Sequence, residues 1–378
     1  MAKLVDFCKI NMGQSPESSS YNENGSGLPF FQGNADFGEL NPKVRVWCNA
    51  PTKIANPNDI LLSVRAPIGA LNIADVQCCI GRGLAALTAD NSKCTQKYLW
   101  YALQSKVEEL NSKGTGSTFK AIGKSVLHDT EIPLPTIEKQ YEVAAVLDNV
   151  TQLIKARKQQ LKELDMLVKS RFIELFGSVN NEDTLINLCT FIDYRGKTPE
   201  KADSGLPFIT AKNIKMHYMS FDTQEFISKE TYDRVMTRGF PQVGDVVFTT
   251  EAPLGNVCRI PHIDTEFYIG QRIITMHTQT LEPAYLEYAL SAESFKSKLR
   301  EKSSGSTVTG IRSKLLEQLT IPVPERAVQR EFAAFVEHTD KLKFAVGKAA
   351  ILYSTLLLNF TNIHWKRRAS ASNKGVNL

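Results

Sequence analysis

The sequence contains two copies of one unit, arranged in tandem. The segment GSTFKAIGKSVLHDTEIPLPTIEKQYEVAA, which begins at Gly116, aligns without a gap with GSTVTGIRSKLLEQLTIPVPERAVQREFAA, which begins at Gly305, 189 residues later (305 − 116). Self-similarity at a fixed separation indicates that one structural unit occurs twice. The alternative, two unrelated domains that share turn-forming residues, does not account for so long a match. We therefore expect two domains with the same topology.

Shorter matching segments precede these two, with loops of different length between them. NDILLSVRAPIG, from Asn58, corresponds to GDVVFTTEAPLG, from Gly244, and YLWYAL corresponds to YLEYAL. Runs of β-branched and aromatic residues that are interrupted by Pro and Gly predict short strands. A short amphipathic helix is predicted near residues 97–110 and again near 284–299. The predicted fold class is α+β, with two similar domains of mixed or antiparallel strands and short helices.

Each copy ends in a long predicted helix. There is no Pro or Gly from Ile137 to Phe176, and Gly177 provides the expected stop. The second helix is predicted at about residues 325–363. Apolar residues recur at every seventh position, as in a coiled coil. The residues expected to pack are Leu147, Ile154, Leu161, Val168 and Leu175 in the first helix, and Phe335, Leu342, Val346, Tyr353 and Leu356 in the second.

Helices of this length need a packing partner. About 40 residues make a helix roughly 60 Å long. We expect the two helices to pack against each other as an antiparallel coiled coil, which gives the chain an approximate two-fold axis; the alternative is that each folds back on its own domain. The predicted divisions are domain 1 at 1–135, helix 1 at 136–178, domain 2 at 179–324, helix 2 at 325–364, and a basic, disordered tail at 365–378.

Charge and composition narrow the possible functions. The apolar share is 42% and the charged share is 22%, as in a folded globular protein. The net charge is +5, and the chain outside its tail is almost neutral, so contacts to a polyanion would need locally placed Lys and Arg. No apolar run is long enough for a membrane helix and no signal peptide precedes the first domain, which predicts a cytoplasmic protein.

Motifs for catalysis and for metal binding are not found. The seven Cys and six His are not at metal-ligand spacing. The triplets at Lys124 and Lys197 resemble a phosphate-binding loop, but the required Gly five positions before the triplet is Thr118 in one and Phe191 in the other. The segment at Asn56 lacks the second Pro and the aromatic residue of a DNA methyltransferase motif. We predict that this chain has no catalytic residues, no metal and no cofactor of its own.

The order of elements resembles the specificity subunits of type I restriction-modification systems, the HsdS family. The strings that carry the resemblance are PNDILLSVRAPIG, CIGRG, GSTFKAI and IPLPTIEKQYEVAAVL in the first half, and GDVVFTTEAPLGN, YIGQR, GSTVTGI and IPVPERAVQREFAAFV in the second. The match covers about residues 1–363. It implies two target recognition domains, each of which binds one half of a bipartite DNA sequence. The helices would set the gap between the halves, near one duplex turn of about 34 Å.

The resemblance also implies partners. These are double-stranded DNA, two modification (methyltransferase) subunits that bind the helices and use S-adenosylmethionine, and restriction subunits that use ATP and Mg. This chain would be a non-catalytic subunit of that complex. A second hypothesis is a duplicated protein-binding scaffold without DNA specificity, which the near-neutral charge favours. A third, the recognition part of a single-chain restriction and methylation enzyme, leaves no residues for catalysis.

The candidate DNA contacts are our own inference. The resemblance cannot assign them, because target recognition domains vary most in the residues that contact bases. Side chains that can bind base edges or phosphates were sought in loops. In the first half they are Gln32, Asn34, Arg65, Arg82, Lys113, Ser117, Thr118 and Lys120. In the second half they are Arg195, Lys197, Thr210, Lys212, Asn213, Gln271, Arg272, Lys302, Ser306, Thr307 and Arg312. Because Arg65 corresponds to Glu251, the two half-sites are predicted to differ, so that the DNA sequence is asymmetric.

Overall fold

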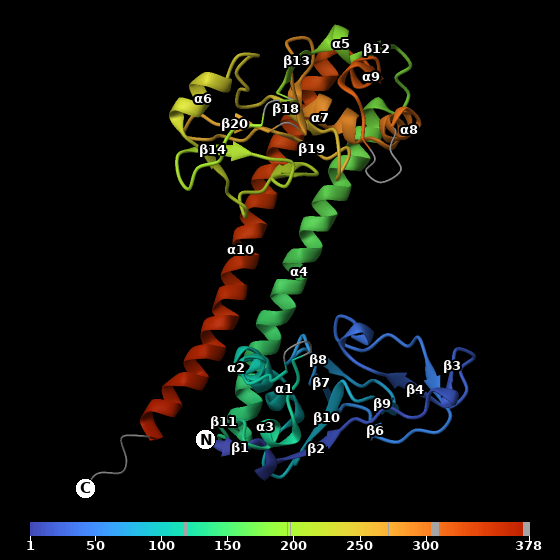
Figure 1. The fold of residues 1–378 in the computed structure, drawn as a ribbon, viewed down its shortest axis with the longest axis vertical. Coiled ribbons are helices and arrows are strands. Elements are labelled where there is room, and N and C mark those ends of the chain that lie inside the picture. The colour runs from blue at the N-terminus through green and yellow to red at the C-terminus, as the bar shows by residue number, and fades with distance from the viewer. Residues whose placement is uncertain (117–119, 195, 197, 271, 304–309, 373–378) are drawn as a thin grey trace. The chain divides into compact units, whose positions relative to one another are not determined.

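The computed structural model divides into two compact units (Figure 1). Unit 1 consists of Met1–Lys158 and Gly347–Leu378, and unit 2 of Gln159–Val346. The structure describes residues 1–378 except 117–119, 195, 197, 271, 304–309 and 373–378. Each unit contains one globular domain and parts of both long helices.

The main sheet of unit 1 has four antiparallel strands in the order β2-β10-β7-β8. Its strands are β2 (Cys8–Met12), β10 (Leu84–Ala89), β7 (Ile60–Ser63) and β8 (Leu71–Ile73). Alternate residues point to opposite faces of a strand. Ile60 and Leu62 lie in one apolar cluster and Leu61 lies in another, so both faces of β7 are covered. This explains why the strand reads as an unbroken apolar run.

A second sheet of unit 1 carries loops that contain candidate DNA contacts, among them Gln32 and Arg82. It has the order β3-β5-β4-β9-β6, and β4 runs parallel to β9. These strands are β3 (Tyr21–Asn22), β5 (Trp47–Cys48), β4 (Leu28–Phe31), β9 (Cys78–Ile80) and β6 (Ile54–Ala55). The N-terminal β1 (Ala2–Lys3) pairs with β11 (Glu131–Ile132), which connects the beginning and the end of the domain.

Unit 2 repeats the main sheet and the parallel strand pair of unit 1, whereas its second sheet is smaller, with the order β17-β14-β20 and a separate pair of strands, β15 and β16. Its main sheet has the order β13-β21-β18-β19, and β14 runs parallel to β20, as β4 runs parallel to β9. The duplication predicted from the sequence is therefore confirmed in the fold. The strands are β12 (Glu182–Thr184), β13 (Thr190–Asp193), β14 (Leu206–Ile209), β15 (Ile214–Lys215), β16 (Tyr218–Met219), β17 (Phe226–Ile227), β18 (Val246–Thr249), β19 (Val257–Arg259), β20 (Tyr268–Ile269), β21 (Ile273–His277) and β22 (Thr320–Pro322).

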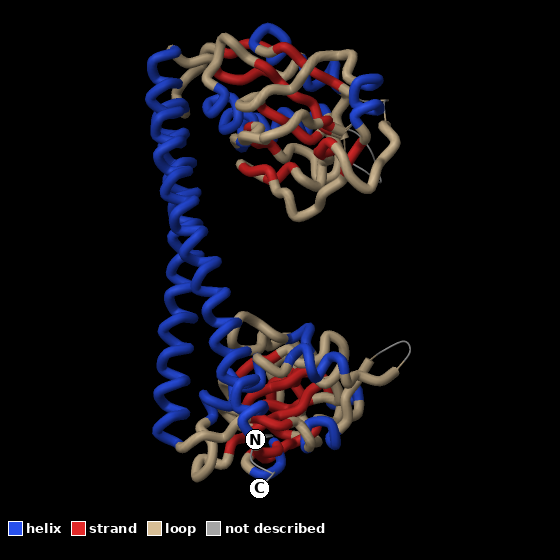
Figure 2. The backbone as a smooth tube through the Cα atoms, turned by 90° about the vertical axis from the view of Figure 1, so that its left-hand side faces the viewer, coloured by secondary structure: helices blue, strands red, loops and turns tan. Residues whose placement is uncertain are grey.

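Short helices cover the strands of each unit (Figure 2). Where the sequence predicts one helix in each copy, the structure has two. In unit 2 the helix is interrupted at Ala292, whose backbone is extended (φ −66°, ψ 148°). The helices are α1 (Gln96–Gln104), α2 (Val107–Ser112) and α3 (Lys124–His128) in unit 1, and α5 (Leu185–Leu188), α6 (Lys229–Val235), α7 (Pro283–Ser291), α8 (Glu293–Lys302) and α9 (Ser313–Glu317) in unit 2; the single-turn 3-10 helices are η1 (Leu4–Asp6), η2 (Ser18–Ser20) and η3 (Asn34–Asp36).

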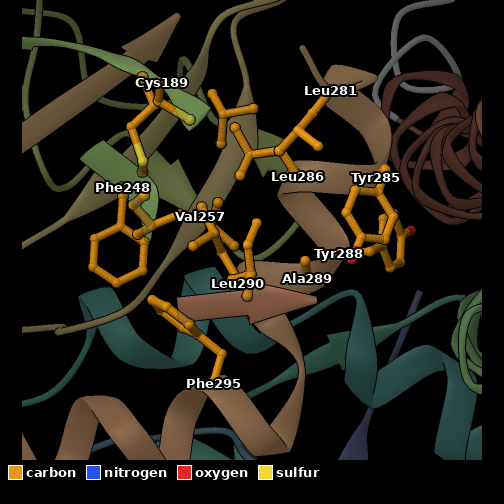
Figure 3. Packing of buried hydrophobic residues seen from close by; sticks show 14 of the residues in the cluster. Cys189, Phe248, Val257, Leu281, Tyr285, Leu286, Tyr288, Ala289, Leu290 and Phe295 are labelled. Atoms are coloured by element: carbon orange, nitrogen blue, oxygen red, sulfur yellow. The ribbon is translucent and has the colours of Figure 1, made fainter. Parts of the chain in front are cut away.

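The core of unit 2 forms around α7. Tyr285, Leu286 and Leu290 of this helix are at most 1% exposed and pack with Phe248 of β18 and Phe295 of α8 (Figure 3). The equivalent helix α1 buries Tyr98, Leu99, Ala102 and Leu103 in unit 1. Burial of one aromatic or aliphatic side chain of this size contributes about 1.5–3 kcal/mol. The repeated tyrosine is also anchored in the same way, because Tyr98 and Tyr285 donate hydrogen bonds to the carbonyls of Pro133 and Pro322 at 2.7 and 2.6 Å.

The two long helices are α4 (Ile137–Phe176) and α10 (Arg326–Ser372). Gly177 follows α4 and donates from its backbone N–H to the Ile173 carbonyl at 2.8 Å, as a helix stop does. No Pro interrupts the chain after Arg326, and α10 continues into the segment that the sequence predicts as a tail. No helix in the described part of the chain has a stretch long and apolar enough to cross a bilayer.

The long helices pack against each other in antiparallel orientation. In unit 2, Arg171 forms an ion pair with Glu331, and Asp165, earlier on α4, pairs with Lys343, later on α10, at 2.7 Å. The rings of Phe172 and Phe332 are 5.5 Å apart. In unit 1, Leu357 of α10 packs against the core cluster to which the first turns of α4 contribute. The predicted helix pair is thus confirmed (Figures 1 and 2).

The predicted contact residues of the helices are only partly correct. Leu147 and Val168 are at most 1% exposed, but Leu342 and Leu356 are 44% and 49% exposed. The sequence of α10 offers two series of apolar positions, one through Phe332, Val346 and Tyr353 and one through Phe335, Leu342 and Leu356, which an ideal coiled coil would bury together. The structure instead buries Phe332, Val336 and Thr339, so the second series turns partly outward. The stripe that faces inward begins with Phe332, at 0% exposure, rather than with Phe335. The residues of intermediate burial are Ile154, Leu161, Leu175, Phe335, Val346 and Tyr353.

Candidate nucleic-acid interface

A groove lies in unit 1 where β4, β7 and β9 end. It has a volume of about 540 Å³, and its lining includes Gln32, Asn34, Arg65 and Arg82. These are four of the candidate DNA contacts from the first half of the sequence, and the fold brings them to one surface. Gln32, Arg65 and Arg82 are exposed, and Asn34 is half-buried. A concave surface with several side-chain donors can receive the edge of a base or a phosphate.

Asp36 fixes one wall of the groove. Its side chain is mostly buried; one carboxylate oxygen accepts the backbone N–H groups of Gln32 and Gly33 at 2.7 and 3.3 Å, and the other pairs with Arg45. These bonds tie the Asp36 carboxylate to the backbone of the loop after β4. They also neutralise Arg45, which the sequence analysis did not select. No sequence pattern links an Arg to an Asp nine positions earlier in a loop.

The backbone around Arg65 and Arg82 is tightly connected. The Val64 N–H donates to the Gly83 carbonyl at 2.9 Å, so that the two arginines flank one hydrogen bond between neighbouring segments. A Cβ atom at Gly83 would lie 2.4 Å from the Gln32 carbonyl oxygen, and only glycine allows this approach. Neither the Arg65 nor the Arg82 guanidinium forms an ion pair with a residue that the structure describes. Their charges are therefore available to a ligand.

Tyr21 and Phe30 form an aromatic wall of the groove, and Tyr21 lies close enough to Arg82 for its pKa to be affected. The rings of Tyr21 and Phe30 are stacked with centroids 4.7 Å apart. Burial raises the pKa of the Tyr21 hydroxyl above its usual value, and the positive charge of Arg82 partly opposes this shift. Tyr21 is thus neutral at physiological pH, and the net charge of the groove comes from its arginines.

The described residues that flank the repeated Gly-Ser-Thr sequence in unit 1 are bonded to each other and to the chain after Arg65. Thr115 and Ala121 exchange backbone hydrogen bonds at 2.9 and 3.0 Å, and the Ala66 N–H donates to the Lys120 carbonyl at 3.1 Å. Lys120 is therefore close in the chain fold to Arg65 and is exposed. Lys113 pairs with Glu109 at 2.6 Å. Ser117 and Thr118, both candidate contacts, lie outside the described residues.

Unit 2 has the same backbone arrangement with different side chains. The Thr250 N–H donates to the Arg272 carbonyl at 3.0 Å, which reproduces the bond between Val64 and Gly83. Glu251 therefore occupies the position of Arg65. Its Oε2 pairs with Nε of Arg272 at 3.2 Å, and both side chains are substantially exposed. Sequence alignment showed the exchange of Arg for Glu, but not this ion pair.

The remaining candidates of unit 2 divide into three groups. Lys302 and Arg312, which flank the second Gly-Ser-Thr sequence along the chain, are exposed, and so is Lys212, close to Thr210 in the sequence. Thr210 is half-buried and donates its hydroxyl to Asn213 at 2.9 Å. The candidates Arg195, Lys197, Gln271, Ser306 and Thr307 lie outside the described residues.

Asn213 is a correction to the candidate set. Its side chain is 3% exposed, its Oδ1 accepts from Thr210, and its amide donates to the carbonyls of Ser220 and Thr223 at 3.0 and 2.8 Å. All of its hydrogen-bonding groups are used within the loop. Asn is common in loops because its side chain bonds to nearby backbone, and this role cannot be told from base binding in the sequence.

A buried ionic network in unit 2 was not predicted. Glu287 of α7 is 1% exposed and accepts from Arg259 at 2.6 Å, while Nδ1 of His217 lies 2.8 Å from its other oxygen. Arg259 also pairs with Asp340 of α10 at 3.0 Å. Burial lowers the pKa of Arg259, but the two carboxylates raise it more, so the guanidinium remains charged. The network joins the domain to the helix and has no nucleophile.

The described residues do not form a metal-binding site. They contain no group of three or more His, Cys, Asp or Glu side chains that could hold a metal ion. All seven Cys are buried, and burial raises the pKa of Cys78 in β9 to about 12, so its thiol is protonated. The adjacent Cys78 and Cys79 lie in β9 and are fully buried, so they pack in the core.

Both repeats of the chain match the model of a known protein family. A model of the type I restriction modification DNA specificity domain (Methylase_S) matches residues 1–165 and again residues 184–351. The chain belongs to this family. Each match covers one of the two repeats, so the type I specificity domain occurs twice, in agreement with the resemblance seen in the sequence.

Relatives of this specificity-domain protein are found among curated proteins. A Methanocaldococcus jannaschii protein that is named as an MjaX type I restriction enzyme specificity subunit is 40% identical over 163 residues, which cover 43% of this chain and 38% of the relative. The MjaVIII specificity subunit of the same organism is 23% identical over 76% of this chain and 74% of its own. The alignment with the first relative thus spans well under half of that protein.

The fold of the specificity-domain protein is also found in a solved structure. The S subunit of the type I restriction-modification system of M. genitalium matches over 94% of both chains with a TM-score of 0.56 and 17% identity. At this identity the comparison establishes the fold alone. It confirms the predicted class, two similar α+β domains with a pair of long helices.

Proposed function

We propose that this chain is the DNA-binding specificity subunit of a cytoplasmic type I restriction-modification complex and has no catalytic role of its own. The observation that carries the proposal is the duplicated specificity domain, in which equivalent backbone segments present a polar surface built from different side chains. Two similar domains with different contact residues suit a bipartite, asymmetric DNA sequence.

In this proposal each domain binds one half-site. Exposed basic side chains at the ends of the strands contact phosphates and base edges, since phosphate contacts fix the position on the duplex and base contacts provide specificity. The proposed contacts that the structure describes are Gln32, Asn34, Arg65, Arg82, Lys113 and Lys120 in unit 1, and Thr210, Lys212, Arg272, Lys302 and Arg312 in unit 2.

The long helices would set the distance between half-sites and would dock the partner subunits. Large apolar side chains on α4 support a docking role, because Met166, Leu167 and Ile173 are 56%, 51% and 68% exposed. Exposed apolar surface of this kind marks protein interfaces. The proposed partners are two modification subunits, which would supply S-adenosylmethionine chemistry, and restriction subunits, which would use ATP and Mg. The proposed domain limits are residues 1–135 and 179–324.

Binding to duplex DNA in the assembled complex tests this proposal. The chain is combined with its modification subunits, and affinity for genomic fragments is measured from about 50 to 200 mM salt. Six to ten phosphate contacts would weaken binding by about 10³- to 10⁵-fold over that range. Selective, salt-dependent retention of fragments is expected. Complex formation without any DNA selectivity would contradict the proposal and would favour a duplicated protein-binding scaffold.

A further inference from the structure

One position differs in charge between two otherwise equivalent backbone sites. Arg65 follows β7 and Glu251 follows β18, and both positions lie next to the same inter-segment hydrogen bond, Val64 to Gly83 in unit 1 and Thr250 to Arg272 in unit 2. The residue before this position is bonded in the same way in both units, since the backbone N–H of Ile122 donates to the Val64 carbonyl and that of Ile311 to the Thr250 carbonyl, each at 2.9 Å. The fold therefore presents this position identically in both units.

The side chains in unit 1 are donors. Arg65 and Arg82 share the groove with Gln32, and the one carboxylate of its lining, Asp36, is committed to Arg45 and to two backbone N–H groups. A guanidinium has five N–H donors and no acceptor. In the major groove guanine presents two acceptors, O6 and N7, and bidentate arginine contacts to them are the commonest specific contacts.

The side chain in unit 2 is an acceptor. Glu251 is 43% exposed, and its ion pair with Arg272 engages Oε2 through Nε. Among the described residues, Oε1 of Glu251 receives no hydrogen bond. Adenine N6 and cytosine N4 are the amino donors of the major groove, and a carboxylate accepts from such a group. Guanine offers that edge only acceptors, which a carboxylate would repel.

We propose that the position of Arg65 and Glu251 is the base-selecting position of both units. Arg65, assisted by Arg82, selects guanine in one half-site, and Glu251, oriented by Arg272, selects a base with a major-groove amino group, adenine or cytosine, in the other. This inference rests on the proposed function and adds the identity of the bases. It also explains how one fold can bind two different half-sites.

Methylation by the assembled complex tests the assignment. The full chain and its modification subunits are incubated with a DNA library in which both half-sites are randomised, and methylated molecules are sequenced. For Arg65→Gln the preference for guanine at one position of one half-site is expected to fall by about 5- to 150-fold, the range of a bidentate contact. Glu251→Gln is expected to relax one position of the other half-site only. Lys9→Gln and Glu230→Gln, exposed and distant in sequence from both sites, are the matched controls.

Arg65→Lys separates base selection from phosphate binding. It keeps the charge but loses the bidentate fork, so guanine preference is expected to fall as in Arg65→Gln. If Arg65→Lys retains the preference, or if neither variant alters its half-site while the natural complex still yields a bipartite sequence, the inference is overturned and the proposed function stands. If the natural complex methylates no defined sequence, the proposed function itself fails. The unchanged half-site in each variant shows that the protein has folded.

Discussion

At the scale of single residues, duplicated side chains anchor each long helix to its domain. Gln140 and Gln329 are at most 1% exposed; their amides donate to the carbonyls of Pro135 and Pro324, and their oxygens accept the backbone N–H groups of Thr95 and Glu282. Each glutamine thus closes the junction where the chain leaves the last strand. Buried polar groups are kept only when they are hydrogen-bonded, which explains why this residue occurs in both copies.

The ionic network of unit 2 gives a residue-scale prediction. Glu287→Gln removes the charge that compensates Arg259 and is expected to destabilise unit 2 by about 2–3 kcal/mol, below the roughly 3–5 kcal/mol for a fully buried pair, because Arg259 remains 31% exposed. Hydrogen exchange of peptides from unit 2, measured by mass spectrometry, reports this change. Glu301→Gln, an exposed residue of the same unit, is the control. Equal protection in both variants would show that the network is not stabilising.

At the scale of elements, the structure shows why periodicity located the long helices better than it located their contacts. The absence of Pro and Gly from Ile137 to Phe176 predicts a helix with the observed bounds. The seven-residue periodicity predicts that both apolar series of α10 face the partner helix, but 3.6 residues per turn do not match a seven-residue repeat, so an apolar series drifts around the helix. Leu342 was accordingly predicted to pack and is exposed.

This difference can be measured on α10. Phe332 is buried, and its ring centroid lies 5.5, 5.4 and 5.3 Å from those of Phe172, Phe176 and Tyr288. Phe332→Ala is expected to cost about 3–5 kcal/mol of unfolding free energy. Leu342→Ala, on the same helix, is expected to cost about 0.5 kcal/mol or less, as surface substitutions do. Urea unfolding of the isolated chain gives both values; similar costs would contradict the observed orientation of α10.

The loops could be predicted less well than the strands and helices, for a physical reason. Short strands and turns follow from local residue preferences, and the repeat revealed that the domains share one topology. Which loop side chains meet depends on long-range backbone contacts, such as that between Val64 and Gly83. Sequence reasoning therefore selected Arg65 and Arg82 by residue type alone, missed the pairing of Arg45 with Asp36, and took the loop-fixing Asn213 for a surface group.

At the scale of the whole molecule, the chain consists of two specificity domains, each with its own candidate surface, and one pair of long helices. The same strand order in the main sheet and the same parallel strand pair occur in both units, while side chains at equivalent positions such as Arg65 and Glu251 differ. Neither domain shares residues of its candidate surface with the other. If each domain binds its own half-site, then the two halves of the recognised sequence can be exchanged independently.

A domain exchange tests this claim most directly. Residues 1–135 are replaced by the equivalent segment of another type I specificity subunit, and the methylated sequence in cells that also produce the modification subunits is determined by methylome sequencing. We predict that one half of the bipartite sequence becomes that of the donor while the other half stays unchanged. A change in both halves, or the same sequence as before the exchange, would contradict independent reading by the two domains.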